Sequence, residues 1–169
     1  MTNIIGIDAS LSSTGLCVFN LTENLIEDAN KIVTKSKQLQ GERLCIIRNS
    51  IEDIIKKYNV KVMVVEEPFT GKNKGTSNKL QRVVGNLECL AYQYGLEYIE
   101  LPPKAVRSFL MDNGSASKEE VAEYIQKEFC ESPIVKNLGE LNDRACKSKN
   151  SDMYDAIAVA IAYRNSKNQ

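Results

Sequence analysis

The stretch NIIGIDASLSSTGLCVFNL, residues 3–21, decides how the fold begins. Its two apolar segments, NIIGID at 3–8 and GLCVFNL at 15–21, are short and rich in β-branched and aromatic side chains, which is typical of buried strands. The linker ASLSST between them consists mainly of turn-forming residues, so we expect the two strands to be joined by a turn. A weaker strand signal follows at about 29–34. The sequence therefore predicts a three-stranded meander at the start of the chain.

Beyond the meander, the spacing of apolar residues changes to the helical period. Apolar residues recur at 44, 47, 51, 54, 55 and 58, which predicts a helix. VKVMVVEEP, residues 60–68, is then a short apolar run ended by Pro68, as expected of a buried strand. A strand, a helix and a strand in succession predict the α/β class.

The second half of the chain alternates in the same way. A helix is predicted over about 76–94, because apolar residues at 80, 83, 84, 87, 90, 91 and 94 form one stripe that Gly95 can close. LEYIEL at 96–101 predicts another strand. Three helices are expected after it: near 104–111, from Ser117 with Glu120 in a capping box, and over about 151–164. The segment 131–150 is a polar connection, and no linker divides the chain, so we expect one domain over 1–169.

The composition excludes several classes of chemistry. The chain has no histidine, so a Ser-His-Asp or Cys-His nucleophile and a histidine-ligated zinc are excluded. Its five cysteines are an odd number without a CxxC pair, and we expect buried free thiols. The net charge is zero, so overall charge gives no sign of a nucleic-acid partner. Hydrolytic chemistry would have to rest on carboxylates, lysine or a hard metal ion.

The chain offers no signal for a membrane or for export. No apolar run approaches the roughly 20 residues that a membrane span needs. The N-terminal sequence MTNIIGIDAS lacks the charged start and long apolar stretch of a signal peptide. We therefore expect a cytoplasmic protein.

Five acidic residues stand against the local apolar pattern. Asp8 ends the first strand, Glu66 and Glu67 end the strand that starts at 60, and Asp152 and Asp155 begin a helix that continues AIAVAIA. Residues three apart share a helix face, and the alanines behind the two aspartates imply close packing, plausibly on the sheet. The carboxyl ends of strands form the crevice of an α/β sheet, so four carboxylates are expected to converge there. Spacing alone does not choose between Glu66 and Glu67.

Carboxylates held so close oppose one another's ionisation unless a cation neutralises them. Ligation by oxygen alone favours Mg²⁺ or Mn²⁺, and two such ions can activate water and stabilise the leaving oxygen in phosphodiester hydrolysis. Each acid taken singly also has an ordinary explanation as a turn cap, a solvated strand end or a partner of the helix dipole. As a set, the acids favour a metal-dependent nuclease.

The sequence resembles the RuvC family of Holliday junction resolvases over nearly its whole length. The resemblance is carried by IIGIDASLSSTG (4–15), VVEEPFTGKNKGTSNKLQRVVG (64–85), LPPKAVRSFL (101–110), GSASKEEV (114–121) and DMYDAIAVAIAY (152–163). It implies an RNase H-like fold, with a mixed five-stranded sheet flanked by helices, and a homodimer. It also implies an endodeoxyribonuclease that depends on Mg²⁺, with Mn²⁺ as a substitute, and that resolves four-way DNA junctions by paired nicks in opposed strands.

The resemblance assigns roles residue by residue. The family's four catalytic carboxylates, which bind the metal, fall on Asp8, Glu66, Asp152 and Asp155. This match prefers Glu66 over Glu67. Lys118 matches a catalytic basic position near the scissile phosphate, Arg107 matches another, and Lys104 is a further candidate phosphate contact. A solvated helix face is the ordinary alternative for these three basic residues.

The chain departs from the family pattern in two places. The Pro-Gly that usually follows the first aspartate is Ala9-Ser10 here, which changes the turn but removes no ligand. The low overall charge suggests a smaller DNA footprint and looser junction selectivity. In this respect the compact chain is closest in character to the virus and phage branch of the family, which implies a bacterial or phage-infected host cell.

A basic strip, residues 68–87, partly offsets the low overall charge. It contains no acid and four cations: Lys72, Lys74, Lys79 and Arg82. Beside the acid set, this strip favours phosphate binding, although a lysine-rich loop can also serve solubility alone. Phe69 opens the strip, and the resemblance implies that its ring stacks on an unpaired base at the branch point. Covering the end of the core is the ordinary alternative for Phe69.

The helix over 76–94 is the candidate dimer interface. Gly85 would allow close approach, with Leu80, Val84, Leu87 and Leu90 divided between the core and the partner; a plain core helix is the alternative.

Among rival functions, an actin-like kinase needs two large lobes, for which the chain is too short. A non-catalytic RNase H-like DNA-binding scaffold and a flap or fork nuclease on the same fold both stay open.

Overall fold

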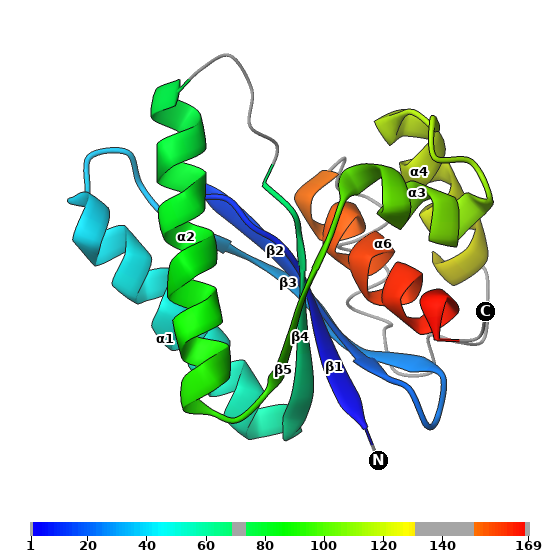
Figure 1. The fold of residues 1–169 in the computed structure, drawn as a ribbon, viewed down its shortest axis with the longest axis horizontal. Helices are drawn as coiled ribbons and strands as arrows, with labels where there is room; N and C mark the ends of the chain where they lie inside the picture. The colour runs from blue at the N-terminus through cyan, green and yellow to red at the C-terminus, as the bar shows by residue number, and fades with distance from the viewer. Residues whose placement is uncertain (1, 69–73, 131–150, 168–169) are drawn as a thin grey trace.

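The computed structural model describes residues 2–68, 74–130 and 151–167, and Figure 1 shows how they are arranged around one sheet. The sheet has five strands in the order β3-β2-β1-β4-β5. These are β1 (Asn3–Asp8), β2 (Ser13–Asn20), β3 (Leu25–Val33), β4 (Val60–Glu66) and β5 (Glu97–Leu101). Strands β1, β2 and β3 pair antiparallel, whereas β4 pairs parallel with both β1 and β5. The mixed five-stranded sheet and the opening meander are confirmed.

The second hairpin is tighter than the sequence pattern predicts. The Oδ1 atom of Asn20 accepts hydrogen bonds of 3.0 Å from the backbone amides of Thr22 and Glu23, and Asn24 adopts a positive φ of 54°. The chain therefore reverses at once, and Leu25 pairs with Asn20. The expected start of β3 near 29 is wrong: the strand begins with the apolar pair Leu25 and Ile26, and Glu27 and Asp28 then interrupt the apolar pattern before Ala29.

Two groups of helices cover the two faces of the sheet (Figure 1). Helices α1 (Gln40–Tyr58) and α2 (Lys74–Gln93) lie on one face. Helix α6 (Ser151–Ser166) lies on the other, under α3 (Pro103–Met111), α4 (Lys118–Ile125) and a π-helical turn, η1 (Gln126–Cys130). The predicted capping box is present: the Glu120 amide donates to Ser117 Oγ at 3.2 Å, and the Ser117 amide donates to Glu120 Oε2 at 2.6 Å.

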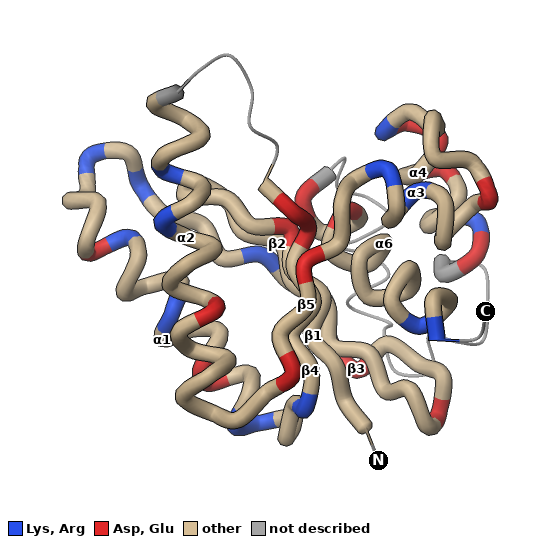
Figure 2. The backbone as a smooth tube through the Cα atoms, in the orientation of Figure 1, with Lys and Arg blue, Asp and Glu red and all other residues tan. Residues whose placement is uncertain are grey.

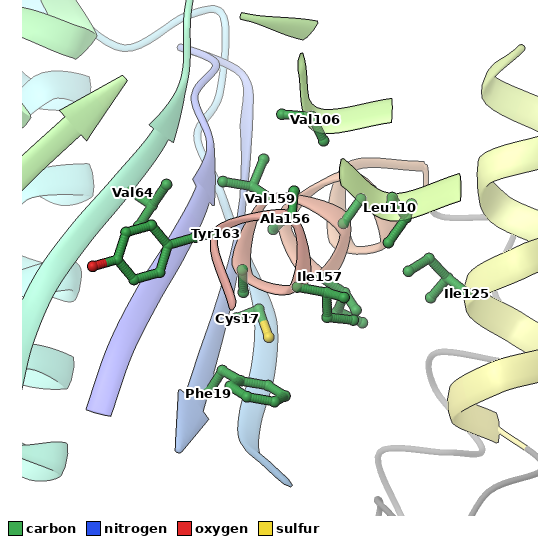
Figure 3. Close-up of a cluster of buried hydrophobic side chains, with 14 of the residues drawn as sticks. Cys17, Phe19, Val64, Val106, Leu110, Ile125, Ala156, Ile157, Val159 and Tyr163 are labelled. Carbon is green, nitrogen blue, oxygen red and sulfur yellow. The ribbon is translucent and has the colours of Figure 1, made fainter. Parts of the chain in front are cut away.

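Helix α6 is enclosed between the sheet and the outer helices. Its alanines 156, 158, 160 and 162 are all buried, and Figure 3 shows the side chains of β2, β4, α3 and α4 converging on it. A Cβ atom added to Gly6 of β1 would lie 2.6 Å from the carbonyl oxygen of Ala156. Small residues on both elements thus bring the backbone of α6 directly against the sheet. The close packing predicted from the alanine-rich sequence is confirmed.

The opposite face of the sheet holds a second apolar core that corrects one prediction. Val84, Leu87 and Leu90 of α2 are buried in it with residues of α1 and the sheet. They are therefore not available to a partner, because the apolar stripe of α2 faces its own sheet. A Cβ atom on Gly85 would meet nothing within 4 Å, and the neighbouring Tyr92 is 89% exposed.

The cysteines follow the predicted burial only in part. Cys17 is buried in the core, whereas Cys45 and Cys89 are exposed because they lie off the apolar stripes of their helices. Among the described residues, no helix has the length and apolar character needed to cross a membrane.

Candidate active site

Two carboxylates meet where the central strands end. Asp8 is the last residue of β1 and Glu66 the last of β4. These strands are parallel neighbours, with Ile7 beside Val65 in the register. The two acids therefore emerge at the same edge of the sheet, as predicted from the chain order.

A glycine brings the start of α6 to this same edge. Gly15 of β2 pairs with Asp8 across the hairpin. A Cβ atom added to Gly15 would lie 1.9 Å from the carbonyl oxygen of Asp152, so only a residue without a side chain fits there. The contact places Asp152 and Asp155 beside the ends of β1 and β4. The roles of Gly15 and Gly6 could not be predicted from the sequence, because nothing in their local pattern marks a contact with residues far along the chain.

The acids interact electrostatically. Burial raises the pKa of Asp8 to about 8, and the negative charges of Asp155, Glu66 and Asp152 add to this rise. Burial and the charge of Asp155 also raise the pKa of Glu66, against the opposing effect of Lys118 and Arg107. The structure therefore brings the four predicted carboxylates together, in a place where the ionisation of Asp8 and Glu66 is unfavourable without a cation.

Glu67 borders the same hollow as Asp8 and Glu66 but differs from Glu66 in its burial. Its side chain is exposed, and its amide donates a 2.8 Å hydrogen bond to the carbonyl oxygen of Leu101, extending the pairing of β4 with β5. Successive residues of a strand point to opposite faces, so the chain can direct only one of the two glutamates toward α6. In this structure it is Glu66 whose pKa responds to Asp155.

Lys118 joins the acid cluster from the outer helices. The Ser117 cap fixes the start of α4, and the Nζ atom of Lys118 lies 2.9 Å from Oδ2 of Asp155. This hydrogen bond raises the pKa of Lys118, and the nearby charges of Asp8 and Glu66 act in the same direction. Lys118 is therefore held as an ammonium ion beside the carboxylates.

The side chains of the acid cluster are of the kind that bind a hard cation. The cluster offers only carboxylate oxygens, and the raised pKa values of Asp8 and Glu66 indicate that a positive charge among them would be favourable. As the side chains stand, no three acids of the described residues are close enough to hold one ion together. The ammonium of Lys118 instead occupies a bonding position on Asp155.

A hollow of about 660 Å³ opens above the acids. It is lined by the acids Asp8, Glu66 and Glu67 and by the basic residues Lys104, Arg107 and Lys118. Figure 2 shows the acidic segments at the ends of the central strands, with basic segments of α2 and of α3 and α4 to either side. We call this hollow the acid pocket.

The remaining predicted DNA contacts fall in different places. Lys79 lines a second hollow beside the acid pocket, whereas Arg82 is an exposed residue of α2 outside both hollows. Lys74 begins α2, and its side chain is not among those that the structure describes. Phe69 and Lys72 lie outside the described residues.

The Ala9-Ser10 departure is compatible with the expected strand and turn. Ser10 Oγ accepts hydrogen bonds from the amides of Ser12 at 3.3 Å and Ser13 at 3.5 Å. The Thr14 hydroxyl donates to the carbonyl oxygen of Ser10. These side-chain bonds hold the turn without the usual glycine.

Comparison with known proteins identifies the family. The model of the family described as crossover junction endodeoxyribonuclease RuvC matches residues 4–163. The chain belongs to the RuvC family. A RuvC protein of Ehrlichia ruminantium is 31% identical over 166 residues, which cover 95% of each chain. One from Rickettsia rickettsii is 29% identical over 167 residues and 98% of each chain.

Solved structures of similar proteins agree with the fold. Thermus thermophilus RuvC in complex with a Holliday junction substrate superposes with a TM-score of 0.79 at 19% identity, covering 99% of this chain and 96% of that one. The yeast mitochondrial Holliday junction resolvase gives 0.74 at 14% identity, with coverage of 99% and 79%. The RNase H-like fold class implied by the resemblance is confirmed.

The raised pKa of Asp8 predicts how the stability of the metal-free protein depends on pH. The folded state holds the Asp8 proton more tightly than the unfolded chain, with a pKa of about 8 against 3.8. The stability that this proton contributes is therefore complete below pH 3.8 and is lost as the pH rises toward 8. Between pH 5.5 and 8, in a chelator, the wild-type free energy of unfolding should fall by roughly 2 to 3 kcal/mol more than that of Asp8→Asn. Urea unfolding curves measure this difference, and parallel behaviour of the two proteins would contradict it.

Proposed function

We propose that this RuvC-family chain is a metal-dependent, structure-selective endodeoxyribonuclease that resolves four-way DNA junctions by paired nicks. The observation that carries the proposal is the meeting of carboxylates from β1, β4 and α6 at one end of the sheet, where burial and the neighbouring negative charges raise the pKa of both Asp8 and Glu66. The names of the relatives, crossover junction endodeoxyribonucleases, support the same activity. We place the enzyme where such DNA lies, in the cytoplasm of a bacterial or phage-infected cell.

Asp8, Glu66, Asp152 and Asp155 would hold the metal, for which we propose two Mg²⁺ ions, with Mn²⁺ as a substitute. When bound, such ions supply an activated water and stabilise the charge of the leaving oxygen. The chain itself supplies the carboxylates at the end of the sheet, and the burial that raises the pKa of Asp8 also limits access of bulk water. To take up the metal, Asp155 would exchange its bond to Lys118 for a bond to the ion.

The basic wall of the acid pocket would hold the substrate. Once released from Asp155, the ammonium of Lys118 can contact the scissile phosphate, where it would stabilise developing negative charge. Arg107 and Lys104 line the same wall and would bind the phosphates beside it. Metal held among the carboxylates would reduce their repulsion of the scissile phosphate, so metal binding would favour its placement over the acids.

Paired nicking requires two active sites related by a two-fold axis, so we propose a homodimer. Its interface would use the outer side of α2, where Gly85 leaves open space and Tyr92 is exposed. The apolar stripe on the inner side is already buried in the core.

A panel of labelled DNA substrates tests the proposed activity. Four-way, three-way, flap and linear duplex DNA of shared sequence would be incubated with the protein in Mg²⁺ and in EDTA. We expect cutting of the four-way junction in Mg²⁺, at least about 100-fold faster than of the duplex, and none in EDTA. Faster cutting of the flap would favour a flap nuclease, and binding without cutting in any metal would favour a non-catalytic scaffold.

A further inference from the structure

A second hollow lies beside the acid pocket and has the opposite electrostatic character. It has a volume of about 260 Å³ and lies between the β1–β2 turn and the start of α2. Its polar lining consists of Ser10, Ser12, Arg43, Thr76 and Lys79, and no carboxylate of the described residues lines it. We call it the Arg43 pocket. It shares Ala9 and Leu80 with the acid pocket, so the two hollows are adjacent.

Arg43 is buried without a compensating negative charge. It is only 8% exposed and occupies the first position of the α1 stripe that continues with Ile47, Ile51 and Ile55. Its Nε donates to Thr34 Oγ1 at 2.7 Å, and one terminal nitrogen donates to the Leu11 carbonyl at 3.1 Å and to Ser12 Oγ at 3.0 Å. All these acceptors are neutral. Within the described part of the chain, no carboxylate lies within ion-pair distance of Arg43.

Holding the β1–β2 turn in place does not by itself require a buried guanidinium without a counter-charge. Burying a guanidinium costs free energy unless a counter-charge is close, and neutral acceptors return only part of that cost. The exposed Lys79 adds a second cation to the same hollow, which increases the unbalanced positive charge. A planar guanidinium, an ammonium and several hydroxyl groups are the donors that bind phosphate in proteins.

We propose that the Arg43 pocket binds a phosphate group of the DNA backbone, one that lies on the strand passing through the acid pocket. This rests on the proposed function for the identity of the ligand, whereas the anion site itself rests on the charge and lining of the pocket. Because Ala9 directly follows Asp8, a phosphate anchored there would fix which phosphodiester lies over the carboxylates. Arg43 and Lys79 are thus positioning residues for the cut.

The first test uses inorganic phosphate and the wild-type chain without DNA. Nuclear magnetic resonance of arginine Nε groups would compare Arg43 with Arg48, which lies on the same helix outside the pocket and bonds to the neutral Gln93. We expect the Arg43 Nε and the Ser12 amide to shift in a saturable way, with Arg48 unchanged, and Lys79→Gln to weaken the response at least about 3-fold. No saturable shift at Arg43, or an equal shift at Arg48, would overturn the anion site.

The second test uses junction DNA in which single phosphates are replaced by neutral methylphosphonates, with binding measured in EDTA at about 0.1 M salt. At one position near the cut, the replacement should weaken wild-type binding about 3- to 10-fold. The same replacement should weaken binding by Lys79→Gln or Arg43→Lys less than about 2-fold, because the contact is already lost, whereas Arg48→Gln should behave as wild type. If no single replacement weakens binding by wild type more than binding by these variants, the proposal that the Arg43 pocket binds a DNA phosphate is wrong. Failure of the chain to bind any junction, with a normal phosphate response, would contradict the proposed function and leave the anion site standing.

Discussion

Asp155→Asn is expected to reduce junction cleavage by at least roughly 10²- to 10³-fold while changing junction binding by less than about 3-fold. Asp155 interacts with three members of the cluster: its charge raises the pKa of Asp8 and Glu66, and its Oδ2 lies 2.9 Å from Lys118 Nζ. A ligand that acts in the chemical step affects the cutting rate far more than the affinity for DNA. Single-turnover cleavage and fluorescence anisotropy measure the two quantities.

The same result is expected for Asp8→Asn, Glu66→Gln and Asp152→Asn. Glu67→Gln is the matched control, because it makes the same chemical change at the neighbouring residue, whose side chain is exposed. Glu67 borders the acid pocket, but it is not among the charges that shift the pKa of Asp8 or Glu66. The variant should therefore cut at a rate within about 3-fold of wild type. Full activity in any two of the four acid variants, or global unfolding of all four, would contradict the proposed metal centre.

Gly15→Ala is expected to reduce cleavage about 100-fold by displacing the start of α6. The added Cβ atom would lie 1.9 Å from the Asp152 carbonyl oxygen, which is backbone and cannot turn aside. Asp152 and Asp155 would move away from Asp8, and a misplacement of about 1 Å can cost 10²-fold in rate. DNA binding should persist, because the basic residues of α2 and α3 do not depend on this contact.

The control for this change is Gly41→Ala near the start of α1, where an added Cβ atom would meet nothing within 4 Å. It should retain wild-type cleavage and melting temperature to within a few degrees. Wild-type cleavage by a folded Gly15→Ala protein would show that the contact with α6 does not position the acids.

Much of the fold could be predicted because its signals are local. The short apolar segments, the helical stripes and the Ser117–Glu120 capping box each depend on residues close together in the chain. The first residues of β3 could not be predicted because Glu27 and Asp28 separate Leu25 and Ile26 from the rest of the strand, and because its start depends on the Asn20 turn. The sequence could not show that the apolar stripe of α2 packs on its own sheet rather than partly on a partner, because periodicity identifies an apolar helix face but not the surface that this face contacts.

The candidate site shows the same limit. The pattern identified acids at strand and helix ends, but the distinction between Glu66 and Glu67 needed the orientation of β4 against α6. The roles of Gly6 and Gly15 depend on contacts with residues more than a hundred positions away. Arg43 did leave a signal, a charged residue at a stripe position with Ile47 and Ile51, but the absence of a carboxylate around it is visible only in three dimensions.

The most direct test of the proposed function is to map the nicks in a four-way junction whose opposed strands carry different labels. In Mg²⁺, we predict cuts at symmetrically related positions in both opposed strands, giving two nicked duplexes that DNA ligase can seal. In EDTA, and with Asp155→Asn in Mg²⁺, neither strand should be cut. Cutting in EDTA, cutting by Asp155→Asn at the wild-type rate, or nicks of unrelated position in only one strand would contradict a carboxylate metal centre that resolves junctions.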